Sequence, residues 1–271
     1  MKILISGGCG YIGSVLCNLL LKKNINFAVI DNLSNSSKKF LPLNTKFYLG
    51  GIENKKVLKR IYYEFNPTHI IHLAASIDVN ESEINKKKYF INNVIYSKKF
   101  LNFFISKGLK NIIFASTAAV YKYDKKIIRE TSKKFPENYY GKTKLFIENY
   151  LLAMKKKNKL NLKILRFFNV IGCDESIKIG NTSKKSKHLF NNICNSILYS
   201  KQFKIYGMDY DTPDGTCIRD FIDVLDLSKI IHFFINTNNI NRNIFNIGMN
   251  KGYSVLEIIN KFQKILKIKI N

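Results

Sequence analysis

The sequence lacks any apolar run near the length that a bilayer requires. The longest, such as residues 111–120, stop far short of the ~20 residues of a membrane-spanning helix. Cysteine is sparse: there are five, an odd number, and no C-x-x-C pair, so that neither a disulfide framework nor a zinc knuckle is predicted. The chain leads from Met1-Lys2 straight into a strand-like segment, without a leader pattern. We therefore expect a soluble, cytoplasmic protein with no membrane partner and no metal.

Acidic residues are also few, with 19 Asp and Glu against 45 Lys and Arg and a net charge of +26. Such an excess is typical of proteins that bind nucleic acid or anionic membranes. Only five of the 45 basic residues are arginines, however, and base readout favours the planar fork of arginine. Because Lys, Asn and Ile share A/T-rich codons, a nucleotide bias explains the charge, and we expect no nucleic-acid partner. A nucleic-acid-binding protein is the alternative that the charge alone supports.

The 271 residues, 46% of them hydrophobic, can bury a sizeable core. Short apolar strands alternate with helix-length segments, which predicts a doubly wound α/β fold with a parallel sheet covered on both faces. The expected strands are 2–6, 27–31, 46–49, 69–73, 111–116 and 162–168, and the expected helices are 11–23, 55–65, 87–107 and 141–157. The pattern changes after Gly172. We expect a Rossmann domain over residues 1–172 and a smaller, incomplete lobe over 173–271, with parts of 216–248 folding back onto the first domain.

A glycine-rich turn follows the first expected strand. Gly8-x-Gly10-x-x-Gly13 overlaps a second glycine pattern that begins at Gly7. Glycine lets the backbone turn tightly and approach a pyrophosphate, while the next helix offers unpaired N–H groups. Asp31 ends the second strand, 18 residues past Gly13, where its carboxylate can bind the adenosine ribose and repel a 2′-phosphate. The pattern favours NAD over NADP; a tight turn without a ligand is the alternative.

Tyr140 and Lys144 have the spacing that puts both side chains on one face of a helix. In a chain with 15 Tyr and so many Lys such a pair also arises by chance, and Tyr121 and Lys125 form a second one. Only Tyr140 opens an amphipathic segment. A neighbouring ammonium and a charged nicotinamide ring would both lower the phenol pKa from its ordinary ~10, as proton abstraction requires. Thr117 ends the fifth strand, so these residues can meet at the carboxyl edge of the sheet.

Further segments extend these motifs along the whole chain. They are His72-Leu73-Ala74-Ala75, residues 116–121 (STAAVY), 140–144 (YGKTK), 166–169 (RFFN), 209–220 (DYDTPDGTCIRD) and 246–257. With the glycine-rich turn and Asp31-Asn32-Leu33, they resemble the extended short-chain dehydrogenase/reductases and, among them, the NAD-dependent UDP-glucose 4-epimerase family. The resemblance covers essentially all of the chain.

The resemblance implies an isomerase that inverts C4 of UDP-glucose and UDP-galactose reversibly, through a transient 4-keto intermediate and bound NAD. Tyr140 would take the proton from the 4-hydroxyl, Lys144 would hold the nicotinamide ribose and lower the tyrosine pKa, and Thr117 would bind the 4-oxygen. The implied cofactor contacts of the domain 1–172 are Gly7, Gly10, Tyr11, Ile12, Gly13, Asp31, Asn32, Asn35, Ser36, Ile52, Leu73, Ala74, Ala75, Asn93, Tyr140, Lys144 and Phe168. The implied substrate contacts are Thr117, Tyr140, Asn169, His188, Leu189 and Arg219, the last as a fork of donors for the diphosphate.

Some positions separate the chain from its relatives. Ala118-Ala119 stand where nucleotide-sugar dehydratases have Asp-Glu, which favours simple epimerisation. Gly51 replaces an aspartate that binds adenine in the family, which predicts weaker cofactor affinity. The family also continues past the position of Asn271 with another diphosphate-binding arginine. A shortened, catalytically weak nucleotide-sugar-binding relative and another NAD-dependent nucleotide-sugar epimerase are therefore alternatives. The family is commonly dimeric through the helices 87–107 and 141–157, so that we expect a homodimer.

Overall fold

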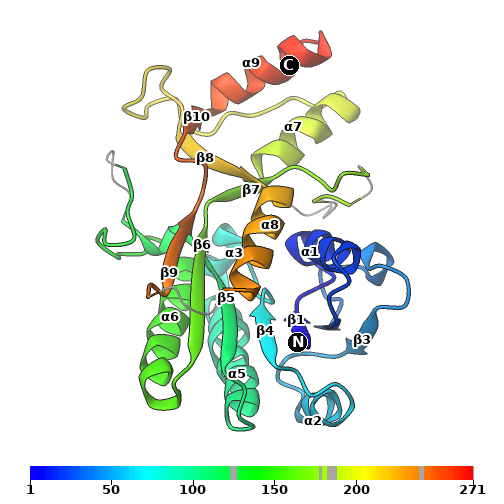
Figure 1. Cartoon of the computed structure of the whole chain (residues 1–271). Helices are drawn as coiled ribbons and strands as arrows, with labels where there is room; N and C mark the ends of the chain where they lie inside the picture. Colours follow the sequence, from blue (N-terminus) through cyan, green and yellow to red (C-terminus); the bar gives the residue numbers. More distant parts are fainter. Residues whose placement is uncertain (123–126, 177–178, 182–187, 238–240, 271) are drawn as a thin grey trace.

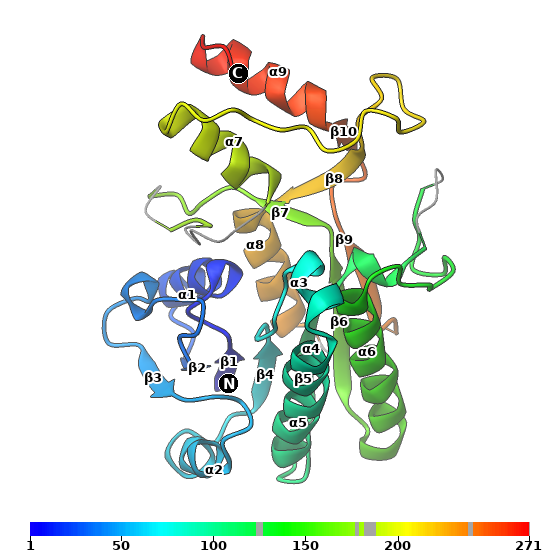
Figure 2. The same ribbon diagram turned by 180° about the vertical axis from the view of Figure 1, so that it is seen from behind.

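The computed structural model describes residues 1–122, 127–176, 179–181, 188–237 and 241–270. Over these residues the chain forms a seven-stranded sheet with helices on both faces and, beyond one end of it, a smaller lobe with a three-stranded sheet (Figures 1 and 2). The predicted doubly wound α/β fold is confirmed. Lys125, part of the second Tyr-x-x-x-Lys match, and most of the polar stretch before His188 lie outside the described residues.

The larger sheet is parallel throughout, with the strand order β3-β2-β1-β4-β5-β6-β9. Its strands are β1 (Ile3–Ser6), β2 (Phe27–Asp31), β3 (Lys46–Leu49), β4 (His69–His72), β5 (Asn111–Thr117), β6 (Asn161–Phe167) and β9 (Ile244–Ile247). β1 and β2 are buried at every residue, as expected for apolar strands covered on both faces. The strand order reverses between β1 and β4, which is where ligands bind in such sheets.

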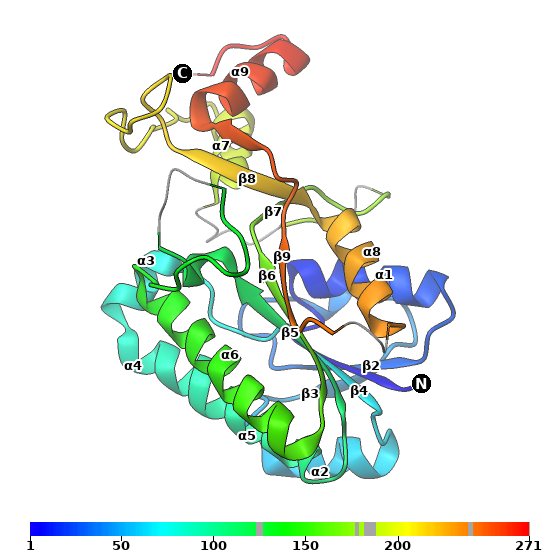
Figure 3. The same ribbon diagram turned by 60° about the vertical axis from the view of Figure 1, so that its left-hand side comes forward.

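Helices cover both faces of this sheet and build two separate cores. On one face, α1 (Tyr11–Lys22) packs against α8 (Val224–Ile235), with Leu16 and Ile231 in the same buried cluster (Figure 3). The other face carries α2 (Lys55–Glu64), α5 (Ser97–Ile105) and α6 (Tyr139–Asn158). Short elements connect these: the 3-10 turns Lys38–Phe40 and Ala118–Val120 and the helix α3 (Val79–Ile84). Within the described residues, no helix is both long and apolar enough to cross a membrane.

The single helix predicted over 87–107 is wrong in its middle. The segment divides into α4 (Lys86–Tyr89), a π-helix over Phe90–Tyr96, and α5. Asn93, only 3% exposed, lies inside the π-helix, and its amide both accepts from the Ser76 N–H (2.8 Å) and donates to the Ser76 carbonyl (2.9 Å). The wider turn directs this side chain at the loop after β4, and π-bulges of this kind are frequent at functional sites. The other predicted helices and strands end within two residues of the observed limits.

The smaller lobe contains β7 (Asn169–Ile171), β8 (Ile218–Asp223) and β10 (Gly252–Ser254) together with α7 (Leu189–Leu198) and α9 (Val255–Leu266). β7 continues directly from β6, so the lobe stands beyond the carboxyl ends of the larger sheet (Figure 2). Its small core is formed by Ile193, Phe221, Ile258 and Ile259. After β8 the chain returns to the larger sheet as α8 and β9 and then enters the lobe again at β10.

Candidate functional site

The glycine-rich turn joins the end of β1 to the start of α1 through close backbone contacts. Gly7 has φ +76°, and a Cβ atom there would lie 2.8 Å from the backbone of Ala74. A Cβ on Gly13 would lie 2.4 Å from the carbonyl oxygen of Gly7. Side chains are thus excluded from the floor of the turn, and the amino terminus of α1 faces the carboxyl edge of the sheet at its switch point. This arrangement fits a pyrophosphate group.

Asp31 lies beside this turn and is 8% exposed. Its carboxylate accepts hydrogen bonds from the Cys9 N–H (3.0 Å), the Leu33 N–H (2.8 Å) and the Ser36 hydroxyl (2.8 Å). Asp31 thereby connects the glycine-rich turn to the loop after β2, where Asn32 and Asn35 are exposed. A carboxylate at the end of the second strand fits a ribose with free hydroxyl groups better than one with a 2′-phosphate.

The remaining predicted cofactor residues surround the turn. Tyr11 donates a hydrogen bond to the Gly172 carbonyl (2.7 Å), which connects α1 to the start of the smaller lobe. Ile52 is buried, and Ile12, Leu73 and Ala74 pack against the buried clusters. At Gly51, the position where the resemblance predicts an aspartate, an added Cβ would lie 2.2 Å from the Glu53 carboxylate. The Glu53 side chain therefore occupies the space of the missing side chain.

Tyr140 lies in the first turn of α6, next to the end of β5. Asn138 caps this helix through a hydrogen bond from the Gly141 N–H (2.7 Å), and the Ser82 hydroxyl accepts from the Tyr140 N–H (3.1 Å). A Cβ on Gly141 would lie 2.3 Å from the Ala119 carbonyl oxygen, so that only glycine allows α6 to approach the turn after Thr117 this closely. No role was predicted for Gly141 from the sequence. Its position at the start of the predicted helix 141–157 was the one sign that the helix packs closely against another backbone there.

Lys144 lies one helical turn further along and is 4% exposed. Its Nζ donates to the Ala115 carbonyl of β5 (2.8 Å) and lies 5.9 Å from the centroid of the Tyr140 ring. Burial lowers the pKa of Lys144 to about 8, and the attraction of Glu148 opposes this shift. The structure thus brings together Tyr140, Lys144 and the carboxyl end of β5.

The pKa of Tyr140 corrects one expectation from the sequence. Burial raises this pKa to about 12, and a hydrogen bond with Thr117 lowers it only in part. The expected lowering by Lys144 is wrong for the protein groups alone, because desolvation of the phenolate outweighs the effect of Thr117. The Thr117 hydroxyl lies close enough to the Tyr140 hydroxyl to lower its pKa, which places the phenol near the end of β5.

His72 is the last residue of β4 and is 1% exposed. Its ring nitrogens hydrogen-bond to the hydroxyls of Ser6 (2.6 Å) and Ser97 (2.9 Å). Burial, helped by repulsion from Lys144, lowers the pKa of His72 to about 3. His72 is therefore a neutral connection between β1, β4 and α5 rather than an acid or base at neutral pH.

Four of the predicted substrate residues, Asn169, His188, Leu189 and Arg219, lie in or next to the smaller lobe, as does the predicted cofactor residue Phe168. Asn169 begins β7 and donates to the Asp220 carbonyl (2.9 Å), and Arg219 is exposed on β8. His188 caps α7 and is followed by Leu189. Phe168 joins β6 to β7, and its N–H donates to the Ile247 carbonyl of β9 (3.0 Å). These residues thus lie on other elements than Tyr140, which is on α6.

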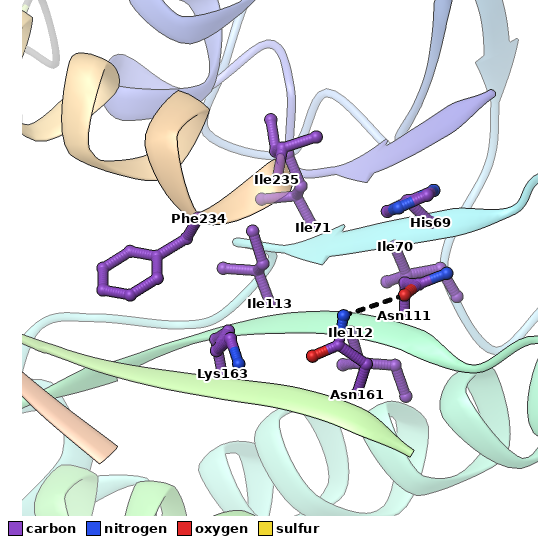
Figure 4. Close-up of a pocket in the computed structure, with 10 residues that line it drawn as sticks. All are labelled: His69, Ile70, Ile71, Asn111, Ile112, Ile113, Asn161, Lys163, Phe234 and Ile235. Atoms are coloured by element: carbon purple, nitrogen blue, oxygen red, sulfur yellow. Dashed lines mark hydrogen bonds between the residues drawn. The ribbon is translucent and has the colours of Figure 1, made fainter. Parts of the chain in front are cut away.

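Two cavities in the described part of the chain lie away from Thr117, Tyr140 and Lys144. A cavity of about 10 Å³ lies at the amino ends of β4, β5 and β6, where Asn161 donates to Asn111 (3.0 Å) near Lys163 (Figure 4). It has room for about one water molecule and lies at the wrong end of the sheet for a ligand site. A groove of about 520 Å³ lies in the smaller lobe, between α7 and the following segment. Its lining includes Asn192, Asn195, Ser196, Tyr199, Lys204 and Tyr206.

Residues 3–248 match the NAD-dependent epimerase/dehydratase family. The chain belongs to this family. Among its relatives is the UDP-glucose 4-epimerase of Azospirillum brasilense, 33% identical over 97% of this chain and 77% of the relative. Membership in an NAD-dependent family agrees with the glycine-rich turn and Asp31, and it confirms the resemblance that the sequence motifs indicated.

Solved structures of family members have the same fold. The UDP-glucose 4-epimerase of Bifidobacterium longum, in complex with NAD+ and UDP, superimposes with a TM-score of 0.93 at 31% identity, over 100% of this chain and 84% of that one. The UDP-Glc/GlcNAc 4-epimerase of Campylobacter jejuni gives a TM-score of 0.83 at 34% identity, over 100% of this chain and 85% of that one. The chain thus spans about four-fifths of the length of these relatives.

Proposed function

We propose that this protein is an NAD-dependent isomerase that interconverts UDP-glucose and UDP-galactose by inverting the configuration at C4. The observation that carries the proposal is the convergence of Tyr140 and Lys144 on the carboxyl end of β5, where Lys144 Nζ lies 2.8 Å from the Ala115 carbonyl oxygen and 5.9 Å from the centroid of the Tyr140 ring. The family and the UDP-glucose 4-epimerases among the relatives support the same reaction. We take isomerisation rather than dehydration as the outcome because Ala118 and Ala119 provide no acid that could drive loss of water.

In this mechanism NAD, when bound, supplies the acceptor and donor of a hydride. The chain's own residues move the proton. The Tyr140 phenolate accepts it from the sugar 4-hydroxyl and returns it to the 4-oxygen after the 4-keto sugar has rotated in the site to present its opposite face. Thr117 holds the 4-oxygen in reach of Tyr140. Because burial keeps the pKa of Tyr140 at about 12 in the protein alone, most of the phenol is protonated at neutral pH. A positive charge beside the phenol is therefore required, and Lys144 is placed to contribute it.

The binding roles follow from where the residues lie. The backbone of the glycine-rich turn, from Gly7 to Gly13, would bind the pyrophosphate, and Asp31 would bind the adenosine ribose. The loops after β2, β3 and β4 would enclose the rest of the adenosine and the nicotinamide ribose. The smaller lobe would hold the UDP group, with Arg219 at the diphosphate and Asn169, His188 and Leu189 at the sugar and uridine. Residues 1–172 and 173–271 would thus divide cofactor and substrate binding between them.

We also propose a homodimer formed by α6 and the helical segment beside it, from the π-helix (Phe90–Tyr96) through α5. Phe90 and Phe146 meet edge to face with their ring centroids 6.1 Å apart, yet remain 38% and 45% exposed. Tyr150 hydrogen-bonds to Asn102 across the same pair of helices. A surface of this kind, apolar and shared by two adjacent helices, suits a two-fold contact with a second copy. Sedimentation should give a dimer for the wild type and a monomer for Phe146→Glu.

All five cysteines are free, including the buried Cys9 and Cys17, which supports a location in the reducing cytoplasm.

The direct test is to incubate the purified protein with UDP-galactose, without added cofactor, and to measure the UDP-glucose formed. Interconversion to an equilibrium mixture, together with NAD released on denaturation, is the expected result. Protein that releases NAD in stoichiometric amount but leaves UDP-galactose unchanged would contradict the proposal.

A further inference from the structure

A fully buried ion pair lies one turn beyond Lys144. Glu148 on α6 and Arg166 on β6 are 1% and 0% exposed. They form a two-pronged contact, with Arg166 Nε 2.9 Å from Glu148 Oε1 and Arg166 Nη2 2.5 Å from Oε2. Burying two charges costs more free energy than packing apolar side chains of similar size, so that a pair of this kind contributes little net stability. Its position suggests another use.

The pair belongs to a row of polar side chains that crosses the sheet. Ser116 on β5, Arg166 on β6 and Asn246 on β9 are register partners. The Ser116 hydroxyl donates to Glu148. On the other side, the Tyr121 hydroxyl accepts from Arg166 Nη1 (2.5 Å) and donates to Asn246 (2.6 Å). Glu148 is therefore bonded to β5 and β6 at once and fixes the position of α6 along both strands.

Glu148 is bonded to β5 at Ser116, next to the residues that contact the candidate site. Ser116 stands between Ala115, whose carbonyl accepts a hydrogen bond from the Lys144 ammonium, and Thr117, which lies close enough to Tyr140 to lower its pKa. The hydrogen bond from Ser116 to Glu148 thus fastens α6 to β5 at the residue between Ala115 and Thr117, the two residues of β5 next to Lys144 and Tyr140. A shift of α6 along β5 would separate Tyr140 from Thr117 and Lys144 from Ala115 together.

We propose that Glu148, held by Arg166 and Ser116, is a positioning residue for the Tyr140–Lys144 pair: it sets the register of α6 on β5 and supplies the negative charge that faces Lys144. The proposal rests on the proposed function for its effect on turnover, but its effect on Lys144 is independent of any reaction.

The charged and titratable groups around Lys144 are few among the described residues. Glu148 and Tyr140 come from α6, the neutral His72 comes from β4, and Arg166 from β6 lies behind Glu148. Of these, Glu148 is the group whose attraction raises the pKa of Lys144 against the effect of burial. Removal of the Glu148 charge should therefore favour the neutral amine.

The charge is tested with Glu148→Gln and with the double variant Glu148→Gln/Arg166→Gln, which leaves no unpaired buried charge and protects the fold. The probe is the pH dependence of reductive methylation of Lys144, followed by mass spectrometry of its peptide. We expect the pKa of Lys144 to fall by about one unit in both variants. The matched control is Glu64→Gln/Arg60→Gln, which removes an exposed pair on α2 and should leave Lys144 unchanged. A folded double variant with an unchanged Lys144 titration would overturn the charge role.

The register is tested with Ser116→Ala, which removes the bond to Glu148 and no charge. We expect kcat to fall about tenfold with KM nearly unchanged, because the substrate contacts in the smaller lobe are untouched. An unchanged kcat in an active enzyme would overturn the positioning role. If the wild type has no epimerase activity, the proposed function fails while the Lys144 titration still decides the role of Glu148.

Discussion

The ammonium of Lys144 and the carbonyl oxygen of Ala115 are 2.8 Å apart, in a part of the fold where the lysine is 4% exposed. A buried lysine whose hydrogen bond goes to a neutral acceptor is held at the expense of stability, because the attraction of Glu148 makes up only in part for the water that its charge has lost. Lys144 belongs to the predicted catalytic site, and functional sites are where proteins tolerate residues that lower the stability of the fold.

Lys144→Met should therefore stabilise the fold at pH 7 while abolishing turnover. The pKa of Lys144 is about 8 in the folded protein against 10.5 unperturbed. Below pH 8 both states hold the proton and the burial cost is complete; from pH 8 to 10.5 the unfolded state binds more proton, so wild-type stability rises with pH. We expect a gain of about 2 kcal/mol at pH 7 that shrinks as the pH approaches 10. Urea unfolding at both pH values measures it, and a gap that is constant with pH would contradict the account.

His72→Gln tests the opposite side of the pH range. The pKa of His72 is about 3 in the folded protein and 6.5 when unperturbed, so the unfolded state binds the proton first as the pH falls. The stability due to neutral His72 is complete above pH 6.5 and is lost on acidification toward pH 3. We expect the wild type to lose about 3 kcal/mol more than His72→Gln between pH 7 and pH 4, measured by urea unfolding. His232→Gln, at a partly exposed position on α8, is the control; equal acid sensitivity of His72→Gln and wild type would refute this assignment.

Gly141→Ala should damage the site with a single methyl group. The new Cβ would meet the Ala119 carbonyl at 2.3 Å, and its other neighbour, the rigid Pro136 ring at 3.0 Å, leaves no flexible side chain to yield. We expect the start of α6 to move away from Thr117, with a loss of about 2 kcal/mol in stability and at least about a tenfold fall in kcat. Gly180→Ala, where the Cβ would lie 3.4 Å from the Cys173 side chain and 3.8 Å from the Gly172 carbonyl oxygen, should leave both unchanged. Wild-type kcat in Gly141→Ala would mean that the close approach is not needed.

Asp31→Asn should reduce the preference for NAD over NADP. The amide keeps one acceptor oxygen for the glycine-rich turn but removes the charge that repels a 2′-phosphate. We expect the ratio of the two affinities to fall about tenfold, measured by fluorescence titration of the apoprotein. Asp226→Asn, an exposed change on α8, provides the control. A preference that survives in Asp31→Asn would place the discrimination elsewhere.

The sequence was sufficient where the physical signal is local. The strands β1 and β2 are apolar up to their last residues, Ser6 and Asp31, and β1 leads into the glycine-rich turn, so their limits and the cofactor edge could be predicted. The π-helix around Asn93 could not, because its cause is the distant hydrogen bonds to Ser76. The pair of Glu148 and Arg166 depends in the same way on the pairing of β5 with β6.

The direction of the Tyr140 pKa shift was predicted wrongly for a related reason. The sequence showed the neighbouring ammonium four residues along, which lowers a phenol pKa, but not the extent of burial, which raises it to about 12. Desolvation depends on packing from α3, α6 and β5 together, and no spacing of residues along the chain reports it.

The central claim is that the Tyr140 hydroxyl moves the proton at the sugar 4-position. Turnover of UDP-galactose by wild type and by Tyr140→Phe, each with its NAD content measured, tests it most directly. We expect kcat to fall about a thousandfold or more in Tyr140→Phe, with the fold and NAD content retained. A Tyr140→Phe protein that converts UDP-galactose at the wild-type rate would contradict it.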